Sequence, residues 1–232
     1  MHLSNLFQVS VVIPMYNGEL YIRDAIQSIL DQDYPVLEVI VVDDFSTDQS
    51  ASIVQSFGEP VHYVKQGCWE SKDSASEALK QGIRLAQGNY LAFIDADDIW
   101  LPRKLSAQID AMQKNPDVDM VFGHVQQFIS PDLSEQERSK LKVNEQPVCG
   151  YLRGAMLINR CSFEKIGDFD SGFFMDWYAR AQDQKLVEMM LPQTVLLRRV
   201  HQNNLCRRDP APKYFPGILK KILDRRRGWH EN

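Results

Sequence analysis

Four apolar, β-branched runs alternate with segments of helical periodicity in the first half of this 232-residue chain, and this alternation limits the possible folds. The runs lie at 9–14, 38–44, 61–66 and 90–95; the first has too few polar positions for a strand with one exposed face, the second ends in acid, and the third is shorter. Strands of this kind are usually covered on both faces, as in a parallel sheet. Apolar residues recur at helical spacing in 22–30, 46–57 and 73–87. The pattern predicts an α/β fold whose sheet is built from strand–helix–strand units.

Two local signals predict where helices begin. Ser46 and Gln49 have the spacing of a capping box, which predicts a helix start beside Ser46. Pro102 suits the first turn of a helix that continues to Met112. The pattern is weaker after residue 116. There we expect strands at 119–129, 151–160 and 194–200, a helix at 176–190, and a mobile polar loop at 130–147.

Composition excludes several classes of protein. The net charge of −5 gives no global attraction to nucleic acid. No run approaches 18 apolar residues, so no transmembrane helix is expected, and MHLSNLFQVSVVIP is typical of a first strand rather than of a signal peptide. The four cysteines form no C-x-x-C pair, which favours reduced, mostly buried thiols in a cytoplasmic protein over a zinc site.

Polar residues follow three of the predicted strands, and they point to a ligand site. Pro14, Tyr16 and Asn17 follow the first, Asp43 and Asp44 end the second, and the acids of FIDADD follow the fourth. In open α/β sheets, ligands bind at the carboxyl ends of the strands. These groups therefore converge if the three strands are parallel neighbours.

Three aspartates, Asp95, Asp97 and Asp98, crowd the end of the fourth run. Residues two apart in an extended chain point the same way, so Asp95 and Asp97 can face one ligand. Clustered carboxylates repel one another unless a cation compensates. Mg²⁺ and Mn²⁺ prefer oxygen ligands and bridge carboxylates to phosphates. The spacing therefore suits a metal–diphosphate site. The alternative is a solvated turn whose acids cap the next helix.

Three segments together resemble the family 2 glycosyltransferases: VSVVIPMYNGELYIRDAIQSILDQ, EVIVVDDFSTDQS and GNYLAFIDADDIWLPRKL. The resemblance covers about residues 9–115, with weaker similarity to about 205. It implies the Rossmann-like GT-A fold, with a mostly parallel central sheet flanked by helices and a small antiparallel extension on the acceptor side. We expect one domain over 1–232. Its parts are a nucleotide-sugar-binding half (9–115), an acceptor and catalytic half (116–205) and a basic C-terminal helix (206–232).

The resemblance also implies roles for individual residues. The nucleotide-sugar site would comprise Pro14, Tyr16, Asn17, Glu19, Asp44, Lys80, Asp95, Ala96 and Asp97. The segment GDFDSGFFMDWYAR resembles the family element that ends in the catalytic base, which assigns that role to Asp176. RRVHQNN resembles a late element that places His201 at the metal or diphosphate. The metal, Mn²⁺ or Mg²⁺, would be held by Asp97, Asp95 and His201.

The implied activity is an inverting transfer of a sugar from a nucleotide-diphosphate donor, a UDP-sugar, to a hydroxyl acceptor on a saccharide, lipid-linked molecule or peptide. Two departures from the family pattern, Met175 before the base and Leu79-Lys80 before the fourth strand, favour an alternative. That alternative is a catalytically weak module that binds nucleotide sugars or acts as a scaffold. A nucleotidyltransferase would need a glycine-rich, basic loop after the first strand, and PMYNGEL has one glycine and no lysine or arginine.

Several side chains keep two interpretations. Trp100 and Trp177 either stack on sugars or pack in the core, and His201 is either a ligand or an ordinary strand histidine. Only one of Arg198 and Arg199 can face inward from a strand. The basic C-terminus, with Lys220, Lys221, Arg225, Arg226 and Arg227, is either a solvated face or a peripheral contact with an anionic membrane.

Overall fold

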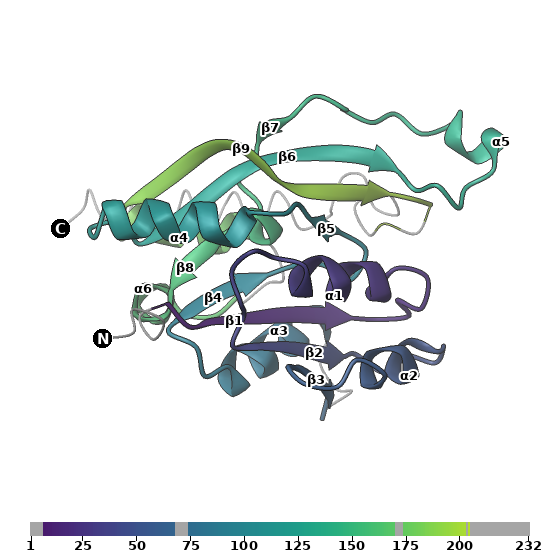
Figure 1. The fold of residues 1–232 in the computed structure, drawn as a ribbon, viewed down its shortest axis with the longest axis horizontal. Helices are drawn as coiled ribbons and strands as arrows, with labels where there is room; N and C mark the ends of the chain where they lie inside the picture. Colours follow the sequence, from purple (N-terminus) through teal and green to yellow (C-terminus); the bar gives the residue numbers. More distant parts are fainter. Residues whose placement is uncertain (1–6, 68–73, 170–173, 203, 205–232) are drawn as a thin grey trace, which may run out of the picture.

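The computed structural model describes residues 7–67, 74–169, 174–202 and 204, and its strands join one mixed sheet (Figure 1). The strands run in the order β3-β2-β1-β4-β8-β6-β9-β5, and β7 pairs with β6. The strands are β1 (Val9–Met15), β2 (Glu38–Asp43), β3 (Val61–Lys65), β4 (Tyr90–Phe93), β5 (Ile99–Trp100), β6 (Met120–Ile129), β7 (Val148–Cys149), β8 (Leu157–Asn159) and β9 (Glu188–Val200). The helices are α1 (Ile22–Leu30), α2 (Ser50–Gln55), α3 (Ser74–Leu85), α4 (Lys104–Lys114), α5 (Glu135–Arg138), α6 (Arg160–Ile166) and α7 (Phe174–Asp183), with a 3₁₀ turn η2 (Arg153–Ala155).

The N-terminal half of the sheet is parallel, as the sequence predicts. β1 lies between β2 and β4, β3 lies beyond β2, and all of these pairs are parallel. β8 then runs antiparallel to β4 and to β6. The predicted GT-A fold class, a mostly parallel sheet with an antiparallel extension, is confirmed.

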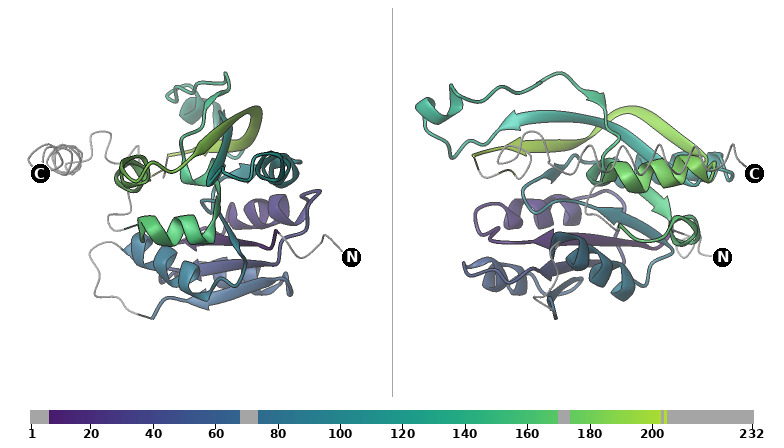
Figure 2. Two further views of the ribbon diagram at one scale, coloured as in Figure 1. Left: turned by 90° about the vertical axis from the view of Figure 1, so that its left-hand side faces the viewer. Right: turned by 180° about the vertical axis from the view of Figure 1, so that it is seen from behind.

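Alternate residues of the central strands face opposite layers of helices. Val11 and Ile13 pack with α1 and α4 on one face, which is turned toward the viewer in Figure 1. Val12 and Val42 pack with α3, α6 and α7 on the other face, which is turned toward the viewer in the right-hand view of Figure 2. Burial on both faces explains why these strands are apolar at successive positions.

The second half of the chain differs from the predicted elements. The predicted helix at 176–190 is α7 alone, and β9 begins at Glu188, earlier than the expected 194. The predicted strand at 151–160 is instead η2 followed by the three-residue β8. The long, twisted β6–β9 pair extends toward α5 (Figure 1), and α5 is a one-turn helix within the expected loop at 130–147.

Both predicted helix starts are wrong. α2 begins at Ser50, with Gln49 at its N-cap position. The Ser46 hydroxyl, which was expected to cap the helix, instead accepts a hydrogen bond from the Asn17 backbone. α4 begins at Lys104, after Arg103 adopts a left-handed φ of 69°. Pro102 therefore lies before the helix, in the turn that follows the Leu101 N–H bond to the Val195 carbonyl.

The cysteine prediction is partly wrong. Cys149 and Cys161 are free thiols, as expected, but both are exposed. Cys68 and Cys206 lie outside the described residues, as does the predicted basic helix at 206–232. Within the described residues, no helix has the length and apolar content needed to cross a membrane.

Gly82 allows α3 to approach the sheet closely. A Cβ added there would lie 2.4 Å from Val12 Cγ1 and 3.2 Å from Val42 Cγ2. Both neighbours are branched side chains on central strands, so they have little room to move. Glycine is therefore required by packing at this position.

We predict that Gly82→Ala destabilises the protein. Overpacking of this kind costs up to about 3 kcal/mol, and the better helix propensity of alanine returns about 1 kcal/mol. The free energy of unfolding should fall by about 2 kcal/mol, measured by urea denaturation. Arg84→Ala, an exposed change on the same helix, should stay within about 0.5 kcal/mol of wild type. A Gly82→Ala variant as stable as wild type would contradict this packing account.

Candidate functional site

The ends of β1, β2 and β4 lie side by side and form the base of the site. Met15 is in register with Asp43, and Val12 is in register with Phe93 two residues before Asp95. The Asp44 backbone N–H donates to the Met15 carbonyl at 2.8 Å. The convergence expected from the sequence is therefore present at this edge.

The predicted nucleotide residues Tyr16 and Asp44 differ in exposure. Tyr16 follows β1 and is 60% exposed, so its ring is available to a ligand. Asp44 is 8% exposed at the end of β2. Pro14 lies within β1, directly opposite Val42. Nucleotide binding by these residues stays a prediction.

Hydrogen bonds join the loops that follow β1 and β2. Asn17 Oδ1 accepts from the Thr47 N–H at 2.8 Å, and Glu19 Oε2 accepts from the Gln49 N–H at 2.9 Å. Gly18 N–H donates to Ser50 Oγ at 2.8 Å. Asn17 and Glu19 thus hold the two loops together, and their contact with a nucleotide sugar stays a prediction.

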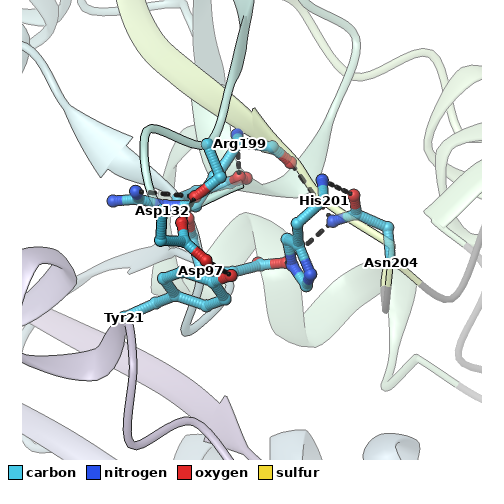
Figure 3. A network of polar contacts seen from close by, with 8 residues as sticks. Tyr21, Asp97, Asp132, Arg199, His201 and Asn204 are labelled. Carbon is cyan, nitrogen blue, oxygen red and sulfur yellow. Dashed lines mark hydrogen bonds and ion pairs between the residues drawn. The ribbon is translucent and has the colours of Figure 1, made fainter. Parts of the chain in front are cut away.

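Asp97 is the meeting point of two groups that follow β9 (Figure 3). His201 Nε2 lies 2.9 Å from Asp97 Oδ2, and Asn204 Nδ2 donates to the same oxygen at 3.0 Å. Asn204 Oδ1 also accepts from the His201 backbone at 2.6 Å, which fixes the turn. The structure therefore brings together Asp97 and His201, which lie 104 residues apart in the sequence.

Asp98 and Arg199 form the buried layer beneath Asp97. Asp98 is 5% exposed, and its Oδ1 accepts from the Arg199 N–H at 3.0 Å. Burial raises the pKa of Asp98 well above its ordinary value, and the charges of Asp97 and Asp95 raise it further. The Arg199 guanidinium donates to the Asp97 carbonyl and to Asp24 Oδ2, both at 2.9 Å. Arg199 is thus the inward-facing member of its pair and is engaged by protein groups.

Asp95 is paired with an arginine that the sequence did not single out. Arg153 Nη2 donates to Asp95 Oδ1 at 2.5 Å. Desolvation alone would raise the pKa of Asp95, but the charge and hydrogen bond of Arg153, with the charge of Arg198, bring this pKa below its ordinary value. The Asp95 side chain is 51% exposed and remains accessible to a ligand. Ala96, between Asp95 and Asp97, is half-buried.

Two of the remaining predicted residues, Asp176 and Lys80, lie on helices α7 and α3, and two tryptophans lie in the core. Asp176 is in the first turn of α7, is 7% exposed, and lies 3.7 Å from Arg180 Nε. Lys80 on α3 pairs with Glu77 Oε1 at 2.9 Å. Trp100 and Trp177 are 1% and 0% exposed, so both pack in the core and the sugar-stacking interpretation is wrong.

The side chains around Asp97 are chemically suited to a divalent cation. A carboxylate and an imidazole already converge, and carboxylate oxygens suit Mg²⁺ or Mn²⁺. Among the described residues, however, no three His, Cys, Asp or Glu side chains form a complete metal site. Such cations are typically held by one or two carboxylates together with substrate phosphates, so the partial set fits a cation that arrives with a diphosphate.

Sequence reasoning missed several residues of this site. Asn204 had a signal, because it stands three residues after His201 in HQNN. Arg153 is a charge inside the otherwise apolar run YLRGAML, which is an unusual position for an arginine. Ser46 accepts a backbone N–H of the first loop, although its spacing to Gln49 predicts a helix start; Ser50 accepts another and gave no distinctive signal.

Comparisons with solved structures support the fold. TarS from S. aureus superposes with a TM-score of 0.69 at 18% identity over 93% of this chain and 39% of its own. A shorter form of TarS was solved in complex with UDP-GlcNAc. The mannosyltransferase PcManGT from Pyrobaculum calidifontis, solved with GDP-Man and Mn²⁺, gives a TM-score of 0.61 at 22% identity over 85% of this chain and 58% of its own. This chain thus spans less than two thirds of either protein.

Sequence comparison identifies the family. An uncharacterized glycosyltransferase from Rickettsia typhi is 34% identical over 92% of this chain and 72% of its own length. The family model for glycosyl transferase family 2 matches residues 10–175, which include β1, β4 and the aspartates that follow β4. The chain therefore belongs to glycosyl transferase family 2.

Proposed function

We propose that the protein transfers a glycosyl group from a nucleoside-diphosphate donor to a hydroxyl acceptor, with inversion at the anomeric carbon. The observation that carries this proposal is the convergence at the sheet edge, where Asp44 and Asp95 flank the end of β1 and His201 meets Asp97. Ligands of open α/β sheets bind at such an edge. UDP is the proposed carrier, supported by the UDP-GlcNAc complex of TarS.

Each group at the edge has a proposed task. Tyr16 would stack on the base, and the Asp44 carboxylate would accept hydrogen bonds from the base or ribose. Asp97 and His201 would hold Mn²⁺ or Mg²⁺, with Asp95 beside them. When bound, the cation supplies positive charge that neutralises the diphosphate. The Mn²⁺ complex of PcManGT supports a divalent cation.

The proposed reaction is a single displacement with Asp176 as the base. The acceptor oxygen forms a bond to the anomeric carbon, and its proton passes to the Asp176 carboxylate. The bond from the anomeric carbon to the phosphate oxygen breaks, and its electron pair leaves with the nucleoside diphosphate. The base must come within about 2.6–3.2 Å of the acceptor hydroxyl, or act through one water molecule.

A catalytically weak binding module is the second candidate. Two observations favour it: Asp176 is 7% exposed, and it lies 3.7 Å from the Arg180 cation. An acceptor hydroxyl reaches a buried carboxylate that already lies beside an arginine less easily than an exposed one. Both candidates bind a nucleotide sugar, so catalysis distinguishes them.

We predict that nucleoside diphosphates stabilise the protein in the presence of Mn²⁺. UDP at about 100 times its dissociation constant should add about 2.7 kcal/mol, which corresponds to a rise in Tm of about 5–10 °C. Asp97→Asn should remove the part of the shift that depends on Mn²⁺. Asp110→Asn, an exposed change on α4, should retain it. Absence of a shift with UDP, GDP, CDP and ADP would rule out the donor site.

We further predict that Asp176→Asn slows turnover without weakening the binding of the donor nucleotide. Loss of a general base costs about 10²–10⁴-fold in rate. The assay is Mn²⁺-dependent release of UDP from UDP-sugars with water as the acceptor, beside calorimetric binding of UDP. Asp183→Asn, at the far end of α7, is the matched control. Wild-type binding of UDP without any release would favour the binding module.

A further inference from the structure

Arg153 is held rigidly by a buried network beneath the site. The three successive carbonyls that follow it each accept a hydrogen bond from a buried side chain. The pairs are Gly154 O with Trp100 Nε1 at 3.0 Å, Ala155 O with Gln108 Nε2 at 2.8 Å, and Met156 O with Lys104 Nζ at 3.4 Å. The position of η2, and with it the origin of the Arg153 side chain, is therefore fixed from below.

The scaffold contains a lysine in an unusual environment for its charge. Lys104 is 1% exposed, and burial holds its pKa well below the ordinary value. Its Nζ donates to Gln108 Oε1 at 2.7 Å and lies 4.1 Å from the centre of the Trp100 ring. Buried polar networks rigidify a structure when their members are satisfied. The network thus fixes the backbone of η2, from which the Arg153 side chain extends toward Asp95.

The other end of Arg153 lies at the accessible edge of the sheet. Its Nη2 pairs with Asp95, whose side chain is 51% exposed, and its Cζ lies 5.8 Å from the centre of the Phe169 ring. Its Nε is buried and has no hydrogen-bond partner within the described part of the chain. Guanidinium has five N–H donors in a planar fork. Of these donors, the contact with Asp95 engages Nη2, so the guanidinium has N–H groups that this ion pair does not use.

We propose that Arg153 binds the β-phosphate of the donor, and that Asp95 holds the guanidinium ready until the donor arrives. This inference rests on the proposed function. Arginine matches phosphate oxygens through two parallel hydrogen bonds, a geometry that lysine does not reproduce. The Asp95 side of the pair is 51% exposed, so a phosphate oxygen can approach the guanidinium there and replace one Asp95 oxygen. The same contact would stabilise charge on the departing diphosphate.

The test compares calorimetric binding of UDP and UMP, with Mn²⁺ present, to the full chain and its variants. Arg153→Gln should lower the affinity for UDP by about 10- to 100-fold, which is what a charge-assisted hydrogen bond contributes. The affinity for UMP should be unchanged, because UMP lacks the β-phosphate. Arg153→Lys should lose less, since it keeps the charge. Arg84→Gln, which removes an exposed positive charge from α3, should bind both nucleotides as wild type does.

The outcomes separate this inference from the proposed function. Equal losses of UDP and UMP in Arg153→Gln would indicate a structural role and overturn the inference, as would unchanged binding of UDP. Thermal unfolding of each variant shows whether it folds. If Arg153→Gln does not fold, the ratio of the UDP and UMP affinities of Arg153→Lys decides between binding of the β-phosphate and a structural role. Wild-type protein that binds neither UDP nor any other nucleoside diphosphate would instead refute the proposed function, and the inference with it.

Discussion

The crowding of three carboxylates after β4 is the constraint on which the rest of the site depends. Like charges so close would raise one another's pKa and destabilise the fold if they shared one environment. The structure gives each carboxylate a different partner. Asp95 pairs with Arg153, and Asp97 contacts His201 and Asn204. Asp98 is buried and accepts a hydrogen bond from the Arg199 backbone. Two of the three carboxylates thus remain near the surface, and the third supports them from below.

All of these partners lie in the second half of the chain, so this half must run back to the end of β4. β9 runs parallel to β6 and ends at Val200, so Arg199 and His201 arrive beside the β4 aspartates. Arg199 also fastens this strand to α1, through Asp24 and the Tyr21 ring, whose centre lies 4.7 Å from its Cζ. The site is therefore assembled from both halves of the molecule, and Figure 3 shows this junction.

The first half of the fold was predictable because its signals are local. Short, β-branched runs such as 9–14, bounded by turn residues and alternating with helical segments, favour buried parallel strands from local sequence alone. The helix start at Ser46 was predicted wrongly because the Ser46 hydroxyl accepts a tertiary hydrogen bond from the Asn17 backbone, and the start at Pro102 because Arg103 adopts a left-handed conformation before α4 begins. The 151–160 segment is apolar like a strand, yet side chains from 100–108 take three of its carbonyls. Such long-range pairing leaves no periodic trace in the sequence.

We propose that Asp97 and His201 accept a divalent cation together with a diphosphate, and that Asn204 orients the Asp97 carboxylate. The most direct measurement is an anomalous difference map, collected at the manganese edge, from crystals grown with Mn²⁺ and UDP. We expect one strong peak in contact with the Asp97 carboxylate and with the diphosphate. A manganese peak elsewhere on the protein, or bound UDP away from the ends of β1, β2 and β4, would contradict it.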